Sequence, residues 1–101
     1  MQLFFLFFSL IAFSQSDFEK GEKLFAQKKY NEAKQSFQDY LKSHPNHTKT
    51  IEYLGDIAGH QKKWDEAIDN YKKLKTSFPK AANYWYKYGG ALGMKAKESN
   101  K

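Results

Sequence analysis

The chain has 101 residues, of which 41% are hydrophobic and 18% aromatic, so it is one folded domain at most and too rich in aromatics for a disordered tail. It has no cysteine, which excludes disulfides, thiolate metal sites and cysteine nucleophiles. Its formal net charge of +6 comes from 17 lysines without any arginine. This favours a solvated surface over a site that grips phosphate or guanine, because such sites usually use the guanidinium group.

The amino terminus is a separate segment. Residues 3–13 read LFFLFFSLIAF, in which Ser9 is the one polar residue. A membrane span needs about 20 apolar residues, so this stretch is too short to be one. It matches the apolar region of a secretory signal peptide, and Ala12 and Ser14 have the spacing of a cleavage site. We predict a signal peptide at residues 1–14 and export to the periplasm or beyond, with no membrane span in the mature chain; the alternatives are an uncleaved anchor or a buried first helix.

An internal repeat organises the rest of the chain. The segment QKKYNEA at residues 27–33 returns as QKKWDEA at residues 61–67, after 34 residues. The same shift aligns Gly21 with Gly55 and then with Gly89. Repeats of this length indicate stacked units, none of which buries its apolar face alone.

The first repeat is expected to contain two helices. Ser16 and Glu19 have the spacing of a capping box, which predicts the start of the first helix. Asn31 is expected to cap the second helix after a short break. Pro45 disfavours helix in the residues before it, so the second helix should end near Ser43.

The second repeat has the same plan. Ile51, Leu54 and Ala58 follow the i, i+3, i+7 spacing of one helix face. Asp65 is expected to cap the next helix, which should end near Ser77 because a proline follows at position 79.

Small residues within the predicted helices indicate close packing. A glycine inside a helix costs about 1 kcal/mol relative to alanine, which makes sense at Gly21 and Gly55 if a partner helix comes close there. Ala33 and Ala67 are the small residues expected to face them. The large aromatic residues of each repeat would then fill the wedge between one hairpin and the next; they are Tyr30, Phe37, Trp64 and Tyr71.

At these positions the chain resembles the tetratricopeptide repeat family, whose 34-residue helix–turn–helix unit has the pattern W-x2-L-G-x2-Y, then A-x3-F, then P. The second repeat matches at Ile51, Leu54, Gly55, Ala58, Trp64, Ala67, Tyr71, Leu74 and Pro79. The first repeat departs from the family at Asp17 and Lys20, as suits a unit whose outer side meets water. The resemblance implies an all-α, right-handed superhelical solenoid of antiparallel helix pairs. Its repeats would span residues 15–47 and 48–81, followed by a partial third repeat or a capping helix at residues 82–101.

The third repeat opens like the others and then departs. Trp85 and Leu92 match the family pattern, but Glu98 and Lys101 stand where the earlier repeats have an aromatic residue and an alanine. Either residues 82–97 form a capping helix that packs its apolar face back on the second repeat, or the chain is the front part of a longer repeat protein. An open face of residues 82–97 would also be a surface for self-association.

The resemblance further implies an inner groove that binds a protein or peptide partner. Position by position, its lining is expected at Phe18, Glu22, Phe25, Lys49, Glu52, Tyr53, Asp56, His60, Asn83, Tyr86, Lys87 and Gly90. An exposed row of Phe18, Tyr53 and Tyr86 among mixed charges is typical of a recognition surface, the alternative being an ordinary surface without a ligand. Glu22 and Asp56 would repel the terminal carboxylate that some members of the family bind.

Other functions find little support in the residues. His44 and His47 lack the third ligand that zinc needs, so no metal or other cofactor is expected. No phosphate-binding glycine loop and no serine, histidine and acid in a recognised arrangement are present, so we expect no catalysis. The lysines are spread over every helix, which disfavours nucleic acid as a partner. We therefore expect a non-catalytic protein–protein interaction module; the alternative is the N-terminal portion of a larger envelope enzyme or sensor protein.

Overall fold

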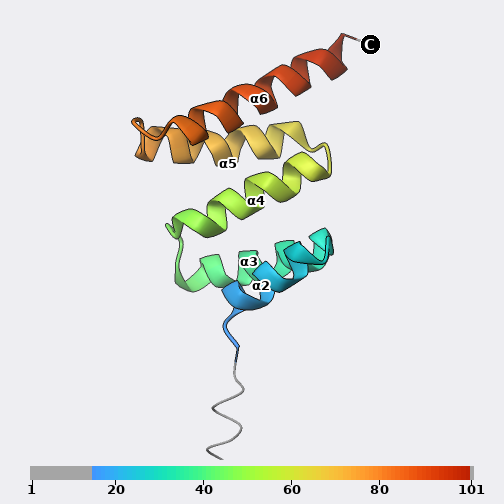
Figure 1. The fold of residues 1–101 in the computed structure, drawn as a ribbon. Helices are drawn as coiled ribbons and strands as arrows, with labels where there is room; N and C mark the ends of the chain where they lie inside the picture. The colour runs from blue at the N-terminus through green and yellow to red at the C-terminus, as the bar shows by residue number, and fades with distance from the viewer. Residues whose placement is uncertain (1–14, 101) are drawn as a thin grey trace, which may run out of the picture.

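The computed structural model of the chain describes residues 15–100, which form a row of α-helices (Figure 1). The helices are α2 (Asp17–Ala26), α3 (Tyr30–Ser43), α4 (Thr48–His60), α5 (Trp64–Ser77) and α6 (Ala82–Ser99). The predicted signal peptide at residues 1–14 and the last residue, Lys101, lie outside the described residues.

The helices pack in chain order. α2 packs against α3 and α4 against α5, so each of these pairs is a hairpin; α3 also contacts α4, and α5 contacts α6. Figure 1 shows the layers following one another from α2 to α6 along the molecule. The predicted fold class is confirmed: the described residues form an all-α helical repeat solenoid of about two and a half repeats.

The ends of the helices test the local predictions. The Ser16 side chain accepts a hydrogen bond from the backbone N–H of Glu19 at 3.2 Å, so the predicted cap of α2 is confirmed. The second helices end at Ser43 and Ser77, as the following prolines predict. In contrast, α6 continues to Ser99 without a break.

The predicted caps at Asn31 and Asp65 are wrong. α3 begins at Tyr30 and α5 at Trp64, one residue earlier, so both polar residues lie inside the first helical turn. The residues before these helices make no side-chain capping bond. Instead, the Asn31 side chain accepts a hydrogen bond from Gln61 Nε2 at 2.7 Å and joins the two turns.

The QKK segments are tight helix-ending turns. Lys62 has a φ of 58°, in the left-handed region, and its N–H donates to Gly59 O at 3.1 Å. The N–H of Lys63 donates to Ala58 O at 2.8 Å, which completes a Schellman motif. Lys28 has a φ of 61° in the equivalent turn of the first repeat. Each turn therefore sends the chain straight into the next helix, which leaves no room for a separate capping residue.

The two glycines of the hairpins lie under aromatic rings. A Cβ atom added to Gly21 would stand 2.6 Å from the Phe37 ring, and one added to Gly55 would stand 2.5 Å from the Tyr71 ring. From the sequence, alanines were expected opposite these glycines, and the aromatic residues between one hairpin and the next. Phe37 lies over Gly21 and also packs between the hairpins, since its ring stacks on Tyr53 of the next hairpin at 4.6 Å between centroids.

α6 covers the end of the core with one side only. Ala91 is buried against α5, and Tyr84 and Tyr88 are partly buried beside it. Trp85 and Leu92 remain 47% and 41% exposed. The helix expected at residues 82–97 thus packs back on the second repeat, but Trp85 and Leu92 of the apolar face predicted to do so stay partly exposed.

Candidate partner-binding groove

The first helices of the repeats bring several predicted groove residues together. A cavity of about 200 Å³ lies between α4 and α6; it is lined by Lys49, Glu52, Tyr53, Asp56 and Lys87. Four of these residues come from α4, where the i, i+3, i+4 and i+7 spacing places them on one side of the helix. Lys87 comes from α6, so the cavity joins two repeats.

Lys87 is held by two carboxylates. Its Nζ donates to Glu52 Oε2 at 2.8 Å and to the two carboxylate oxygens of Asp56 at 2.9 and 3.0 Å. Burial by itself would lower the pKa of Lys87, but the hydrogen bonds and charges of the two carboxylates outweigh it and raise the pKa. Lys87 is therefore a fixed positive charge at neutral pH.

Asp56 also accepts a hydrogen bond from the hydroxyl of Tyr71, the residue whose ring covers Gly55. Burial raises the pKa of Tyr71, and the hydrogen bond to Asp56 raises it further. This hydrogen bond from α5 to a groove residue was not predicted from the sequence. Two features of the sequence could have indicated this hydrogen bond. Tyr71 has a hydroxyl where the first repeat has Phe37, and Asp56 directly follows Gly55, the glycine under the Tyr71 ring.

Tyr53 connects the second repeat to the first. Its hydroxyl donates to Glu22 Oε2 at 2.9 Å while its ring stacks on Phe37. Burial first, and then the hydrogen bond and charge of Glu22, raise the pKa of Tyr53 to about 12. Tyr53 is thus built into the joint between the two hairpins.

The expected row of exposed aromatics is divided in the structure. Phe18 and Phe25 are partly buried, with their ring centroids 6.0 and 5.0 Å from that of Tyr53. Tyr86 stands apart on α6 and is 83% exposed. The expectation of an exposed row is therefore wrong for Phe18 and Tyr53, because these rings pack on one another at the edge of the core.

The remaining predicted residues lie around this cluster and cavity. His60 is exposed at the end of α4, and its ring stacks on that of Tyr30 at 4.7 Å. Lys49 lies 3.6 Å from a Glu52 oxygen, and Asn83 is exposed in the first turn of α6. Whether these residues contact a partner stays a prediction.

The turn histidines have structural contacts. The His44 ring stacks on Tyr40 at 4.2 Å. The Nδ1 atom of His47 accepts from the backbone N–H of Thr50 at 3.3 Å and so caps α4. In the part of the chain from residue 15 to residue 100, no group of three or more histidine and acidic side chains is arranged to hold a metal ion.

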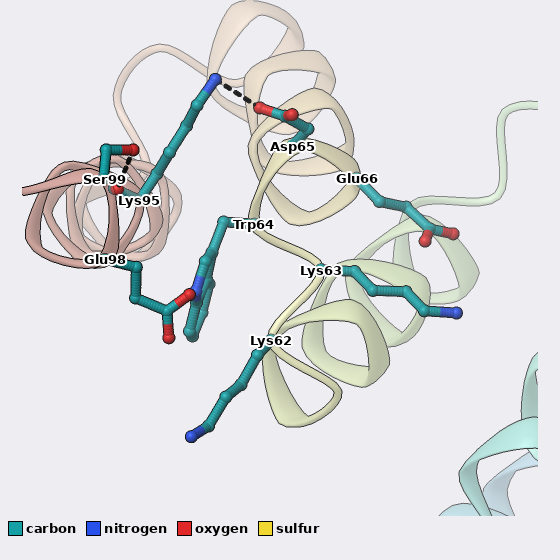
Figure 2. A pocket seen from close by; sticks show the side chains of 8 residues that line it. All are labelled: Lys62, Lys63, Trp64, Asp65, Glu66, Lys95, Glu98 and Ser99. Carbon is teal, nitrogen blue, oxygen red and sulfur yellow. Dashed lines mark hydrogen bonds and ion pairs between the residues drawn. The ribbon is translucent and has the colours of Figure 1, made fainter. Parts of the chain in front are cut away.

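A second, more open hollow of about 500 Å³ lies where the start of α5 meets the end of α6 (Figure 2). It is lined by Lys62, Lys63, Trp64, Asp65, Glu66, Lys95, Glu98 and Ser99. Lys95 reaches across it to pair with Asp65, and this hydrogen bond and charge raise the pKa of Lys95. In Figure 2 the Trp64 ring stands between α5 and Glu98, while Lys63 and Glu66 point away from α6. Because both lysines and acidic residues line this hollow, its charge does not favour one class of ligand.

None of the helices between residues 15 and 100 is long and apolar enough to cross a membrane. A family model described as tetratricopeptide repeat matches residues 15–47 and 51–81, which together make up more than half of the chain. A comparison with curated proteins gives no match.

Proposed function

The chain belongs to the tetratricopeptide repeat family, whose repeats form protein-interaction scaffolds, and from this premise we propose that it is an exported scaffold that binds a partner segment in the groove formed by α2, α4 and α6. Repeat modules of this family are generally non-catalytic, and the proposed role needs no chemistry beyond binding.

One observation supports groove binding more than any other. Tyr86 is 83% exposed, and it directly precedes Lys87, which Glu52 and Asp56 hold in place. An exposed aromatic beside a fixed charge is a favourable anchor, because the ring supplies contact area and the charge is already ordered before binding.

The groove charges favour one kind of segment. Glu22, Glu52 and Asp56 outnumber Lys49 and Lys87 on this side of the helices, although the whole chain has a net charge of +6. Like charges across an interface are unfavourable, so a neutral or mildly basic segment fits better than a free terminal carboxylate.

The test starts from peptides selected on the mature chain from a random displayed library. Their affinities for the wild type and for Tyr86→Ser are then measured by isothermal titration calorimetry. Tyr86→Ser should weaken binding about tenfold or more, because it removes the anchor without touching the core. Phe78→Ser, at another exposed aromatic residue in the turn before α6, is the matched control and should bind like the wild type. Equal binding by Tyr86→Ser would show that the groove is not the site.

Export is proposed from the sequence pattern of residues 1–14 alone. Amino-terminal sequencing of the protein made in its native host should find Gln15 or a neighbouring residue. Retention of Met1 would rule out cleavage. The alternative, in which these repeats belong to a larger envelope enzyme or sensor, predicts that the reading frame continues the repeat beyond codon 101.

A further inference from the structure

The excess positive charge of the chain lies in its C-terminal part. Residues 1–69 contain nine lysines and ten acidic residues, whereas residues 70–97 contain seven lysines and no acidic residue. Lysines therefore occur along the whole chain, but the second half of α5, the turn after it and most of α6 lack acids to balance them. A region unbalanced in this way attracts negatively charged partners more strongly than the same charge spread over the whole molecule.

An exposed aromatic side chain lies within this region, in the turn between α5 and α6. Phe78 follows the last residue of α5 and is 45% exposed. Lys72 and Lys73 are exposed on α5 before it, and Lys80 is exposed after it. We call Lys72, Lys73, Phe78 and Lys80 the basic turn. Figure 1 shows the α5–α6 turn at the opposite end of α5 from the turn that follows α4.

The first repeat shows that the repeat itself does not require these residues. At the same four positions, 34 residues earlier, the chain has Gln38, Asp39, His44 and Asn46. The equivalent turn therefore has one acid and no lysine at these positions. Three lysines around an apolar ring are a property of the second turn alone, so the packing of the repeat does not account for them.

The exposure of the basic turn does not depend on α6 being the last helix. Gln38, His44 and Asn46 are exposed although the hairpin of α4 and α5 follows them. A further hairpin after α6 would leave Lys72, Phe78 and Lys80 accessible in the same way. The basic turn thus differs from the face of α6, which a following helix could cover.

The surroundings of the basic turn are amphipathic. It borders a hollow of about 830 Å³ between the α3–α4 turn and the end of α5, whose lining includes Leu41, Ile51, Leu74, Lys72, Lys73 and Asp69. Apolar side chains beside positive charges suit a partner that is both apolar and anionic. They suit nucleic acid less well, and the chain has no arginine to bind phosphate or guanine in a bidentate way.

We propose that the basic turn binds the surface of a membrane that contains anionic lipids. The ammonium groups of its lysines lie at the negatively charged headgroups, and the Phe78 ring enters the boundary between headgroups and acyl chains. This attachment stays at the surface and needs no membrane-spanning helix. The groove takes no part in it, so the proposal goes beyond the proposed function and does not rest on it.

The test measures cosedimentation of the mature chain with lipid vesicles. The mature chain is used so that the apolar segment of residues 3–13 does not contribute. One set of vesicles is phosphatidylcholine alone, and the other is an equal mixture of phosphatidylcholine and phosphatidylglycerol. We expect binding to the mixed vesicles to be about tenfold tighter or more. Raising the salt from about 0.05 M to about 0.5 M should weaken it, because salt screens charges at a surface.

A fluorescent label can locate the contact. The chain has no cysteine, so Ser77→Cys allows one environment-sensitive dye to be attached in the α5–α6 turn. The control is Gln27→Cys, an exposed position in the turn between α2 and α3. Mixed vesicles should raise the fluorescence of the dye at residue 77 and leave that at residue 27 unchanged.

Matched variants separate the basic turn from the net charge. Lys73→Gln with Lys80→Gln should weaken binding to mixed vesicles about tenfold or more. Lys29→Gln with Lys63→Gln makes the same change of charge in the other turns and should bind nearly like the wild type. Phe78→Ser should weaken binding about fivefold or more, and Phe78→Trp should restore it, because tryptophan also favours the membrane interface.

The proposal is wrong if the chain binds both kinds of vesicle equally or neither, or if the two double-lysine variants bind equally. A fluorescence increase at residue 27 alone would also contradict it. Polyglutamate and a single-stranded oligonucleotide are the comparison ligands. Tighter binding of either than of mixed vesicles, lost in Lys73→Gln with Lys80→Gln, would make the partner an acidic protein or nucleic acid and refute the membrane. Peptide binding in the groove is measured without lipid, so each of the two proposals can fail while the other stands.

Discussion

Gly55 and Gly89 occupy the same position of the repeat in two neighbouring helices, but their surroundings differ. Gly55 is buried under the Tyr71 ring, and Gly89 is open. α4 has 13 residues and ends in the turn at Lys62, whereas α6 has 18 residues and passes the equivalent position, Ala96, without turning. The glycine therefore does not itself create the hairpin. The turn brings the second helix back, and only then does the glycine become necessary.

The largest expected effect comes from filling the two glycine positions. Gly55→Ala should lower the free energy of unfolding by roughly 2–4 kcal/mol, because its methyl group overlaps the Tyr71 ring in a packed core. Gly89→Ala should raise it by roughly 0.5–1 kcal/mol, because alanine is the better helix former and has free space there. Urea denaturation followed by circular dichroism measures both. Similar effects of the two substitutions would mean that the Tyr71 ring moves aside readily, and the contrast would be lost.

Removing the Tyr71 hydroxyl is expected to have an intermediate effect. Tyr71→Phe keeps the ring over Gly55 but loses the hydrogen bond to Asp56, which should cost about 1–2 kcal/mol at pH 7. Lys87 still pairs with Asp56 in this variant, so the carboxylate is not left alone. Thermal and urea unfolding of both proteins measure the difference.

The same substitution should alter the response to alkaline pH. Tyr71 has a raised pKa in the folded chain, so above its ordinary value near pH 10 the unfolded chain loses the proton while the folded chain keeps it. The stability that the raised pKa of Tyr71 contributes is therefore fully present below about pH 10. It is lost as the pH rises, by up to about 1.4 kcal/mol per pH unit for one such group. Tyr71→Phe should lose less stability between pH 9 and pH 11, with a remaining slope from Tyr53, whose pKa is about 12. Equal slopes in the two proteins would contradict this account.

The smallest expected effects concern the turns themselves. Lys62 adopts a left-handed conformation that glycine takes without steric cost, so Lys62→Gly should stabilise the chain by roughly 0.5–1 kcal/mol. Ala96→Gly, at the same repeat position in α6, should instead destabilise that helix by a similar amount, about 0.5–1 kcal/mol. Differential scanning calorimetry can resolve the opposite signs. Stabilisation by both would mean that α6 is ready to turn at Ala96.

Much of the fold could be predicted from the sequence because its signals are local or periodic. Pro45 and Pro79 mark where α3 and α5 end, and the 34-residue period gives the hairpins. The prediction of the helix caps was wrong for a physical reason. The left-handed residue of each turn is a lysine, so no glycine marks the turn in the sequence. The chain therefore turns and re-enters helix earlier than the polar residues Asn31 and Asp65 indicated.

The candidate groove was less predictable than the fold. The resemblance to the family implied Asp56 and Lys87 as groove residues, and the structure brings both to one cavity. The pairing of Lys87 with carboxylates 31 and 35 residues earlier depends on how one repeat is rotated on the next, which spacing does not give. In the same way, the packing of Phe18 on Tyr53 follows from the angle between hairpins.

The ion pairs of Lys87 with the carboxylates of Glu52 and Asp56 connect the second hairpin to α6. Glu52 and Asp56 belong to the second repeat and Lys87 to the third, so the contact crosses the boundary between them. We expect a partner whose own ammonium group pairs with Asp56 in place of Lys87 to weaken this connection and so to change how firmly α6 is held on the second hairpin. By thermodynamic linkage the dependence works in both directions: bending or straightening the solenoid changes how tightly such a partner is held. The stiffness of the solenoid and its affinity for such a partner would then both depend on the ion pairs of Lys87.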